Sequence, residues 1–486
     1  MELVHGPTKP LEVPPPQYRD EVESARLYQE TANVSTISVA PTLQLVEDIA
    51  LRVVQRHITE PTEQWVRAYP FGSCGLAASV ADSDLDIVLF CPFKVTAAVF
   101  FHEFPLLLQT VVGHVIVVAA RVPVVKFAHE GTLVDLVFVS VALAAPPTTE
   151  QLLDDSFLLQ VARETRHSVN GIRFTLEIKR RLPVTYDVFS TVLKVVKLWA
   201  MKRQVYGNLY TYPSGVVLAI MVARACQVMP ASHPNVVLRF FFLFYTQWMS
   251  RHDRISPVYI TTSLQGRGRV PGMPEPWDPA LEKFSHDLLP VLNPAYPFVN
   301  DANAVGRCGL EVFYSEVTRA HHLLSTTESF PLEDVWKPYS ITDDFSSFLL
   351  VQVSCDGNSE EGVENDLEVW SSYVASKLRI LIYAVECIVD ARPYPHKLKD
   401  RVATSLLGPQ HIRRGCVFLI GVRERKDRQK LHQSMFSSAL DEFRYAVQDG
   451  CSSTKGSRVF QRDERSMHGP RLTLIDTLEA LTFLNK

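Results

Sequence analysis

Long apolar runs are missing from this sequence of 486 residues. Its most apolar stretches, residues 85–101, 111–120 and 216–225, are short or interrupted by Asp, Lys or Arg. A membrane-spanning helix needs about 20 predominantly apolar residues, so we expect no membrane partner. The first residues, MELVHGPTKPLEVPPP, have proline where a signal peptide needs an apolar run, so we do not expect secretion.

Paired cysteines and a charge excess are also missing. The eight cysteines include no C-x-x-C spacing, which argues against a zinc ribbon and against a disulfide framework. Lys and Arg number 49 against 53 Asp and Glu, a formal net charge of −4. This balance excludes a polybasic binder but not a local basic groove. We therefore expect reduced thiols in an intracellular compartment.

The composition, 47% hydrophobic and 21% charged, is that of a folded protein. At roughly 150 residues per domain, the length predicts two to four domains. The first sixteen residues are rich in proline and predict an extended arm. Residues 42–59 have the apolar periodicity of an amphipathic helix.

The middle of the chain changes from strand-like to helix-like patterns after Pro146-Pro147. Before it, β-branched and aromatic runs predict strands at 66–73, 85–90, 114–127 and 132–140, with a helix at 95–112. After it, helical periodicity predicts helices at 185–206, 215–229 and 234–249, followed by a loop-rich stretch at 261–303.

A third block begins near Trp336. Its pattern predicts a strand at 345–355, an acidic loop at 356–366, a helix at 370–389 and a strand at 416–425. This alternation suits a small ferredoxin-like α/β sandwich, which many RNA-binding domains use. Fold alone does not establish that role.

Two carboxylates stand one residue apart in the most informative segment, 71–89. Side chains alternate along a strand, so Asp84 and Asp86 project from one face and repel each other unless a cation lies between them. A hard divalent ion such as Mg²⁺ is the usual partner of carboxylate oxygens. Before this pair, and separated from it by ten residues, Gly72 leaves room for a phosphate and Ser73 can donate to it. The Asp pair alone is equally compatible with a polar turn.

A third carboxylate, Asp135, lies in the apolar run TLVDLVFV. A lone charge there is costly unless it is paired or bound to a metal. Three such carboxylates suit a site that transfers a nucleotidyl group with two metal ions. Together with Gly72 and Ser73, they favour this site over a turn.

These residues resemble a known family. Gly-Ser, ten residues, Asp-x-Asp and a later lone Asp resemble the DNA polymerase β-like nucleotidyltransferase superfamily. More specifically, the chain is similar to eukaryotic nuclear-type poly(A) polymerases up to about residue 400. The matching segments are RVPVVKFAHEGTLVDLVF, SVNGIRFTLEIKRRLP, LKVVKLWAMKRQVYGN, SGVVLAIMVARACQVMP, PEPWDPALEKFSHDLLPVLNPAYPFVND and WSSYVASKLRILIYAVE.

The resemblance implies an α+β multidomain fold. After the arm at 1–16, it implies a nucleotidyltransferase catalytic domain at 17–150, a helical central domain at 151–330 and a C-terminal ferredoxin-like (RRM-like) RNA-binding domain at 331–486. The implied activity is template-independent addition of AMP from ATP to RNA 3′ ends in the nucleus. Two Mg²⁺ ions, or Mn²⁺ in their place, and proteins of an RNA-processing and cleavage complex are the implied cofactors and partners.

The resemblance also implies a role for each matching residue. Asp84, Asp86 and Asp135 would be the metal ligands, with Asp135 closest to the primer 3′-hydroxyl. Lys126 would lie near the primer end or the incoming nucleotide. The implied nucleotide-binding residues are Phe71, Gly72, Ser73 and Lys197 at the phosphates, Tyr206, Asn208 and Asn170 at the ribose or base, Gly215 and Val216 at the adenine, and Val80.

Periodicity alone predicts less for several of these residues. It makes Lys197 a solvated lysine on a helix surface and Tyr206 an aromatic residue at the edge of a core.

The chain also departs from the family. Residues 74–77, Cys-Gly-Leu-Ala, replace Tyr-Arg-Leu-Gly, which predicts a weaker grip on phosphate or RNA. Val80 is apolar where a polar residue is usual, and residues 211–214 replace a glycine-bearing turn at the base pocket.

RNA binding must be local in a chain of this charge. The candidate phosphate contacts of the third block are Lys377, Arg379, Lys397, Lys399, Arg413, Arg414, Arg423, Arg425, Lys426, Arg428 and Lys430. Their alternation with acids is equally typical of a solvated loop.

Two other functions stay open. A terminal uridylyltransferase would use the same carboxylates with a different base pocket. A catalytically silent RNA-binding subunit would fit the altered 74–77 loop but not the three retained carboxylates.

Overall fold

The computed structural model describes residues 11–13, 15, 17–32, 38–81, 83–118, 121–250, 256–261, 269–326, 330–400, 412–425, 433–452 and 467–484. Most of the predicted arm and the candidate contacts Lys426, Arg428 and Lys430 lie outside these residues. The chain forms two compact units. One comprises residues 1–198, 215–302 and 328–330, and the other comprises 199–214, 303–327 and 331–486.

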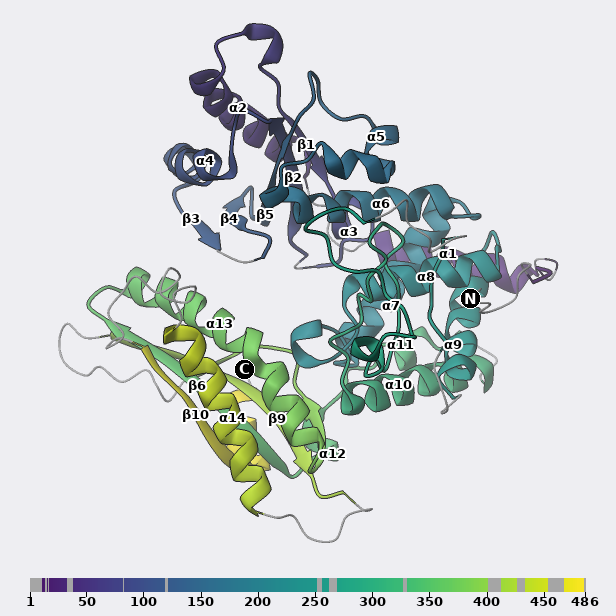
Figure 1. Cartoon of the computed structure of the whole chain (residues 1–486). Coiled ribbons are helices and arrows are strands. Elements are labelled where there is room, and N and C mark those ends of the chain that lie inside the picture. The colour runs from purple at the N-terminus through teal and green to yellow at the C-terminus, as the bar shows by residue number, and fades with distance from the viewer. Residues whose placement is uncertain are drawn as a thin grey trace. The chain divides into compact units, whose positions relative to one another are not determined.

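A five-stranded sheet is the centre of the first unit (Figure 1). Its strands are β1 (Arg67–Pro70), β2 (Leu85–Pro92), β3 (Val115–Val118), β4 (Val124–His129) and β5 (Thr132–Val141), in the order β1-β2-β5-β4-β3. The strands β2 and β5 are parallel, and the other neighbours are antiparallel. The single strand predicted at 114–127 is wrong: this run forms both β3 and β4. Pro123, which has no backbone N–H to donate, lies between them.

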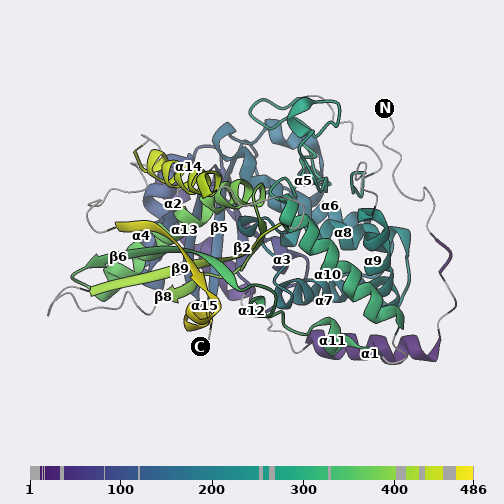
Figure 2. The ribbon, with the colours of Figure 1, turned by 90° about the horizontal axis from the view of Figure 1, so that it is seen from below.

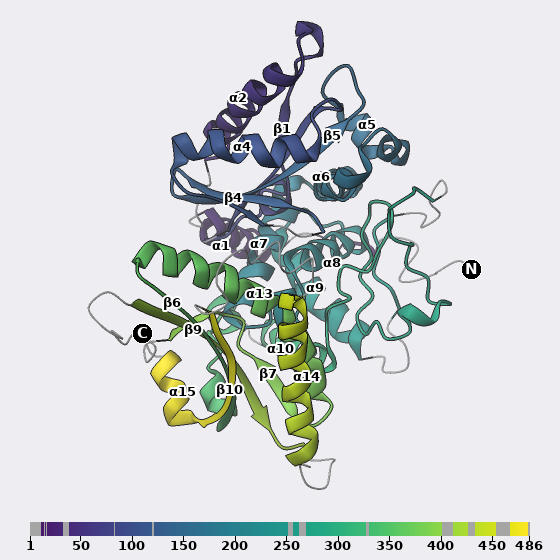
Figure 3. The ribbon, with the colours of Figure 1, turned by 60° about the vertical axis from the view of Figure 1, so that its left-hand side comes forward.

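Both faces of this sheet are covered. Leu85, Ile87 and Leu89 of β2 pack into a core with α2 (Ala40–His57) and α4 (Ala97–Val112), which lie beside each other in Figure 3. Val88 and Phe90 pack into a second core with residues that follow β5, including α5 (Thr149–Leu153) and α6 (Asn170–Arg181). Because side chains alternate along a strand, Asp86 belongs to the α6 side.

Helices build the rest of the first unit, as the periodicity predicts. They include α1 (Tyr18–Ala32), α3 (Gly72–Gly75), α8 (Gly215–Val228), α9 (Pro234–Met249) and residues up to 198 of α7 (Tyr186–Lys202), with 3₁₀ turns at Pro61–Glu63, Asp155–Leu159, Arg163–Val169 and Glu282–Phe284. The buried carboxylate of Glu23 on α1 accepts hydrogen bonds from Arg239 and Asn235 of α9, which ties the first helix to this unit. The three helices predicted between 185 and 249 are confirmed.

A second sheet is the centre of the other unit. Its strands are β6 (Ser347–Gly357), β7 (Asp390–Pro393), β8 (Leu398–Asp400), β9 (Ile412–Arg423) and β10 (Met467–Asp476), in the order β10-β6-β9-β7 with β8 also paired to β9. All of its pairings are antiparallel. Figure 2 shows α13 (Glu360–Glu386) and α14 (Gln433–Ser452) on one face of this sheet and α15 (Thr477–Leu484) on the other.

The remaining helices of this unit are α10 (Arg307–Thr326), α11 (Leu332–Val335) and α12 (Ile341–Asp344), with a 3₁₀ turn at Asn208–Tyr210. The loop predicted at 356–366 is mostly wrong, because α13 already begins at Glu360. The Ser359 hydroxyl caps it by accepting from the Gly362 amide. Carboxylates in the first turn suit the positive end of a helix, so the acidic run starts a helix here. In the part of the chain described, no helix is long and apolar enough to cross a membrane.

Candidate active site

One row of side chains crosses the first sheet at the level of the predicted carboxylates. The strand register places Asp86 of β2 beside Asp135 of β5, and Asp135 beside Lys126 of β4. Asp84 stands one residue before β2 begins. The residues between them face the α2–α4 core, so the carboxylates share the opposite face. The fold therefore brings together three acids that are up to 51 residues apart in the chain.

Burial and neighbouring negative charge raise the pKa of two of these acids. Burial, with the charges of Asp135 and Asp84 beside it, raises the pKa of Asp86 to about 7. The pKa of Asp84 is also raised, first by partial burial and then by Asp135. Both shifts mean that negative charge is costly at this row unless a cation compensates for it.

Lys126 supplies one such cation. Its ammonium lies 2.7 and 2.6 Å from the two carboxylate oxygens of Asp135. Among the residues that the structure describes, no cluster of three or more His, Cys, Asp and Glu side chains is arranged to hold a metal ion. The donors nevertheless fit a hard divalent cation, because all are carboxylate oxygens. Burial, together with the neighbouring acids, raises the pKa of Asp86, so a compensating cation is favoured there.

Gly72 lies directly against Asp86. Its φ of +59° is in the left-handed region, and a β-carbon added there would be only 2.3 Å from Asp86 Oδ2. The amide of Phe71 donates to the Asp86 carbonyl at 3.0 Å. A β-carbon at Gly171 of α6 would be 2.4 Å from the Phe71 ring. The turn that carries Ser73 is therefore packed tightly between β2 and α6.

The helix α7 holds the loop that follows this turn. Lys197 donates from Nζ to the Ala78 carbonyl at 3.0 Å, and the Tyr186 hydroxyl donates to the Gly75 carbonyl at 3.0 Å. Lys197 is only 5% exposed, so the solvated lysine predicted from periodicity is wrong. Burial lowers the pKa of Lys197 to about 8.

The loop residues that depart from the family are partnered within the loop. The Cys74 thiol lies 3.2 Å from the Ser79 hydroxyl, and burial raises its pKa. Val80 is buried, and its amide donates to the Ser83 hydroxyl at 2.9 Å. Val80 thus contributes packing and a backbone turn at this place.

Asn170 is the first residue of α6, and its Oδ1 is buried without a hydrogen-bond partner in the described structure. An unpaired buried acceptor costs about 1–3 kcal/mol, so this oxygen is available for a ligand donor. Gly215 and Val216 open α8, where both are partly buried.

Tyr206 and Asn208 belong to the second unit, in the segment 199–214. Arg203 anchors this segment through two bonds to the buried Glu316, at 2.7 and 2.9 Å. Arg392 of β7 donates to the Arg203 carbonyl at 3.0 Å. Sequence reasoning missed this network because its partners are more than 70 residues apart and no local pattern links them.

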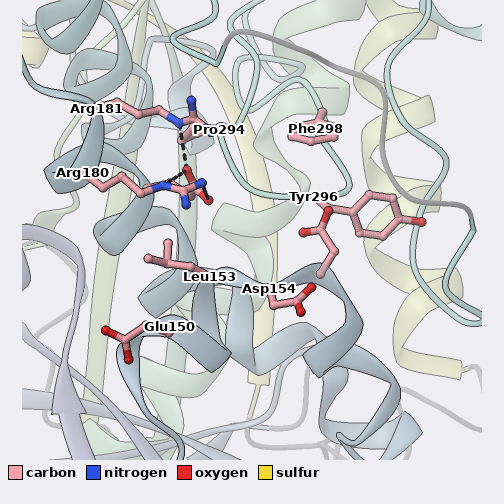
Figure 4. A pocket seen from close by; sticks show the side chains of 10 residues that line it. Glu150, Leu153, Asp154, Arg180, Arg181, Pro294, Tyr296 and Phe298 are labelled. Carbon is pink, nitrogen blue, oxygen red and sulfur yellow. Dashed lines mark hydrogen bonds and ion pairs between the residues drawn. The ribbon is translucent and has the colours of Figure 1, made fainter.

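A separate pocket of about 430 Å³ lies in the first unit (Figure 4). Its lining consists of Glu150, Leu153, Asp154, Asp155, Glu177, Arg180, Arg181, Pro294, Tyr296 and Phe298. None of the predicted site residues is among them. Arg180 and Arg181 both bond to the buried carboxylate of Glu177, so one of their two positive charges is compensated there.

Two family models match the chain. Residues 6–182 match the poly(A) polymerase nucleotidyltransferase domain, and residues 188–338 match the poly(A) polymerase central domain. The chain belongs to the poly(A) polymerase family. The first unit of this family member accordingly has a nucleotidyltransferase-type α+β fold.

Individual relatives are distant in sequence. The chain is 30% identical over 383 residues to a poly(A) polymerase of Dictyostelium discoideum, covering 74% of this chain and 45% of the relative. It is 27% identical to poly(A) polymerase PAPalpha of Candida albicans, covering 83% and 73%. It is 26% identical to nuclear poly(A) polymerase 1 of Arabidopsis thaliana, covering 78% and 52%. The chain thus spans about half the length of the Dictyostelium and Arabidopsis relatives.

Among solved structures, Cid1, described as having RNA terminal uridylyl transferase activity, is 14% identical with a TM-score of 0.46. The match covers 66% of this chain and 99% of Cid1.

Proposed function

We propose that this poly(A) polymerase family member is a template-independent adenylyltransferase that adds AMP from ATP to RNA 3′ ends. One observation carries the proposal: three carboxylates share one face of the sheet beside a glycine turn that fits directly against Asp86. Relatives named poly(A) polymerase, 26–30% identical over most of the chain, support ATP as the nucleotide. The name of the Arabidopsis relative, nuclear poly(A) polymerase 1, supports action in the nucleus. RNA-processing proteins as partners are a proposal that rests on the family resemblance alone.

We assign the arm to 1–16, the catalytic domain to 17–150, the helical central domain to 151–330 and an RRM-like RNA-binding domain to 331–486. The last assignment is supported by strand and helix order. The chain order β6-α13-β7-β9-α14-β10 with the sheet order β10-β6-β9-β7 follows the βαββαβ pattern of ferredoxin-like domains.

The reaction is an in-line attack of the RNA 3′-hydroxyl on the α-phosphate of ATP, with pyrophosphate leaving. The turn at Gly72 and Ser73 offers backbone and hydroxyl donors to the triphosphate. The buried ammonium of Lys197 stands behind the same loop. The unpaired oxygen of Asn170 can accept from a ribose hydroxyl. Tyr206 and Asn208 contact the base and ribose, and Gly215 and Val216 pack against the adenine.

The carboxylates of Asp84, Asp86 and Asp135 would hold the metal ions. Two bound Mg²⁺ ions, or Mn²⁺ in their place, would lower the pKa of the attacking hydroxyl and neutralise the triphosphate. Asp86 and Asp135 lie on neighbouring interior strands of the sheet, whose pairing fixes their backbone positions.

A primer-extension assay tests the nucleotide. A labelled oligo(A) primer is offered each of the four nucleoside triphosphates with Mg²⁺ or Mn²⁺, and we expect AMP addition. Preferential UMP addition would identify a terminal uridylyltransferase instead. No incorporation of any nucleotide, with RNA binding preserved, would identify a catalytically silent subunit.

Substitution of the carboxylates tests the site. Asp86→Ala is expected to reduce AMP addition at least about 100-fold, the scale on which losing one electrostatic stabiliser is felt. Its thermal unfolding should be unchanged or shifted upward, because a buried and repelled charge is removed. Asp48→Ala is the matched control, since Asp48 is an exposed acid of α2 outside the row. Full activity in a variant lacking all three acids would refute the mechanism.

A further inference from the structure

Asp135 already has a cation on both of its oxygens. The Lys126 ammonium is 2.6 and 2.7 Å from them, while both side chains remain partly exposed, at 44% for Lys126 and 25% for Asp135. The same carboxylate is a proposed metal ligand. A divalent ion that binds either oxygen meets the positive charge of the ammonium at short range, so metal and ammonium compete for this carboxylate.

The ion pair between Lys126 and Asp135 follows from the register of the β4–β5 hairpin, and the hairpin does not need it to hold together. The strands β4 and β5 pair over six residues on each side, from Val124 opposite Val137 to His129 opposite Thr132. Glu130 and Gly131 make the turn, both with positive φ. Main-chain pairing and the apolar neighbours Phe127 and Val134, which are buried, therefore keep the strands together. What the Lys126 side chain adds is charge.

That charge acts on the whole row. Lys126 and Lys197 are the cations that oppose the negative charge of Asp86, and Lys126 also opposes that of Asp84. Lys197 is buried and donates to the Ala78 carbonyl. Lys126 is the more exposed of the two, and so it is free to leave.

We propose that Lys126 is an internal counter-ion that occupies Asp135 until a divalent metal displaces it. This inference rests on the proposed metal site and adds a role that site does not require. Because the metal must first displace the Lys126 ammonium, its affinity for the substrate-free protein is lower than it would be without this lysine. Displacement also releases an ammonium beside the acids at the moment the metal arrives, where the phosphates of the substrates can take it up.

Metal binding without substrate tests the proposal. Mn²⁺ binding to the full chain, free of nucleotide and RNA, is measured by the loss of the free-ion electron paramagnetic resonance signal. Lys126→Gln is expected to bind Mn²⁺ about tenfold or more tightly than the natural chain, the effect of removing one competing charge at this distance. Lys126→Arg keeps the charge and should stay within about threefold of the natural chain. Equal or weaker binding by Lys126→Gln would overturn the proposal.

Lys94→Gln is the matched control. Lys94 forms a similar exposed pair with Glu63, at 2.5 Å, in the same unit but away from the row. Its loss should leave Mn²⁺ affinity unchanged. A tenfold gain in this control would show a nonspecific charge effect and would also overturn the proposal.

A second measurement uses the natural chain and does not depend on the folding of a variant. Amine acylation followed by mass spectrometry reports how available each lysine is. Added Mg²⁺ should increase acylation of Lys126 several-fold and leave Lys94 unchanged. Unchanged acylation of Lys126 under saturating Mg²⁺ contradicts displacement.

Asp86→Asn separates this inference from the proposed function. If the natural chain binds Mn²⁺ and Asp86→Asn weakens that binding, the metal site stands, and the Lys126 variants alone decide the counter-ion role. If Mn²⁺ binding is absent or insensitive to Asp86→Asn, the proposed metal site itself fails, and the counter-ion role fails with it.

Discussion

Gly72 and Asp86 show how closely a backbone turn and a carboxylate can be fitted together. Any β-carbon at Gly72 would overlap with Asp86 Oδ2 at 2.3 Å, and the φ of +59° adds backbone strain for other residues. Gly72→Ala should therefore displace the Asp86 carboxylate. We expect AMP addition to fall about 100-fold, as small misplacements of reacting groups do. Steady-state primer extension measures this.

Gly131→Ala separates strain from displacement. Gly131 also has a positive φ, of +75°, but a β-carbon there would meet nothing within 4 Å. Both variants should lose about 1–2 kcal/mol of unfolding free energy through backbone strain. Only Gly72→Ala should lose activity. Equal loss of activity in both would show that the contact with Asp86 is irrelevant.

At this scale the sequence predicted which acids share a face but not what compensates for them. Alternation along a strand is enough to place Asp84 and Asp86 on one face, whereas the place of Asp135 beside them depends on the pairing of β2 with β5. The pairing of Lys126 with Asp135 also had a signal, because a two-residue turn at Glu130-Gly131 makes 126 and 135 opposite. The burial of Lys197 had none, since its acceptor Ala78 is 119 residues away.

Side chains of α7 hydrogen-bond to the backbone of α3 and of the loop after it, and we call these two bonds the α7 clamp. Two side chains on α7 bond to carbonyls at this place: Tyr186 to that of Gly75, the last residue of α3, and Lys197 to that of Ala78 in the loop that follows. Tyr186→Phe removes one bond and leaves the Gly75 carbonyl with one donor fewer, which should cost about 1 kcal/mol of unfolding free energy. Because the loop follows the phosphate turn, the KM for ATP should rise more than kcat falls.

Tyr69→Phe is the control for this change. The Tyr69 hydroxyl makes a bond of the same kind and length, 3.0 Å to the Pro147 carbonyl, within the same unit. It should cost similar stability and leave the KM for ATP unchanged. Thermal unfolding and ATP titrations of both variants test this, and equal KM values would mean that the α7 clamp does not position ATP.

Element prediction succeeded where one signal dominates. The helices α7, α8 and α9 have long apolar faces, and their observed ends lie within four residues of the predicted ones. It failed where two signals compete. At 114–127 the β-branched pattern masked the break at Pro123. At 356–366 the acidic composition masked a helix that Ser359 caps.

The whole molecule carries little net charge, and in the second unit much of the positive charge is paired. Among the candidate RNA contacts, Arg413 bonds to Asp356 at 3.0 Å and Arg423 pairs with Asp390 at 3.6 Å. Lys397 and Arg414 pair with Glu368 and Glu360. Composition alone could not show this, because the partners are 29 to 57 residues apart. Paired cations neutralise fewer phosphates than their number suggests.

Weak, shallow salt dependence of RNA binding follows from this pairing. Each phosphate neutralised on single-stranded RNA contributes about −0.7 to the slope of log K against log salt. With about three contacts, we expect a slope near −2, measured by fluorescence anisotropy of a labelled oligo(A).

Glu360→Gln removes the partner of Arg414 and should steepen the slope by about one contact and tighten binding. Glu361→Gln changes the adjacent acid in the same first turn of α13 and removes the same charge, but leaves the Arg414 partner in place. Equal effects of the two variants would mean that net charge, and not release of Arg414, governs the binding. A slope steeper than about −4 in the natural chain would contradict the view that its positive charge is largely compensated within the fold.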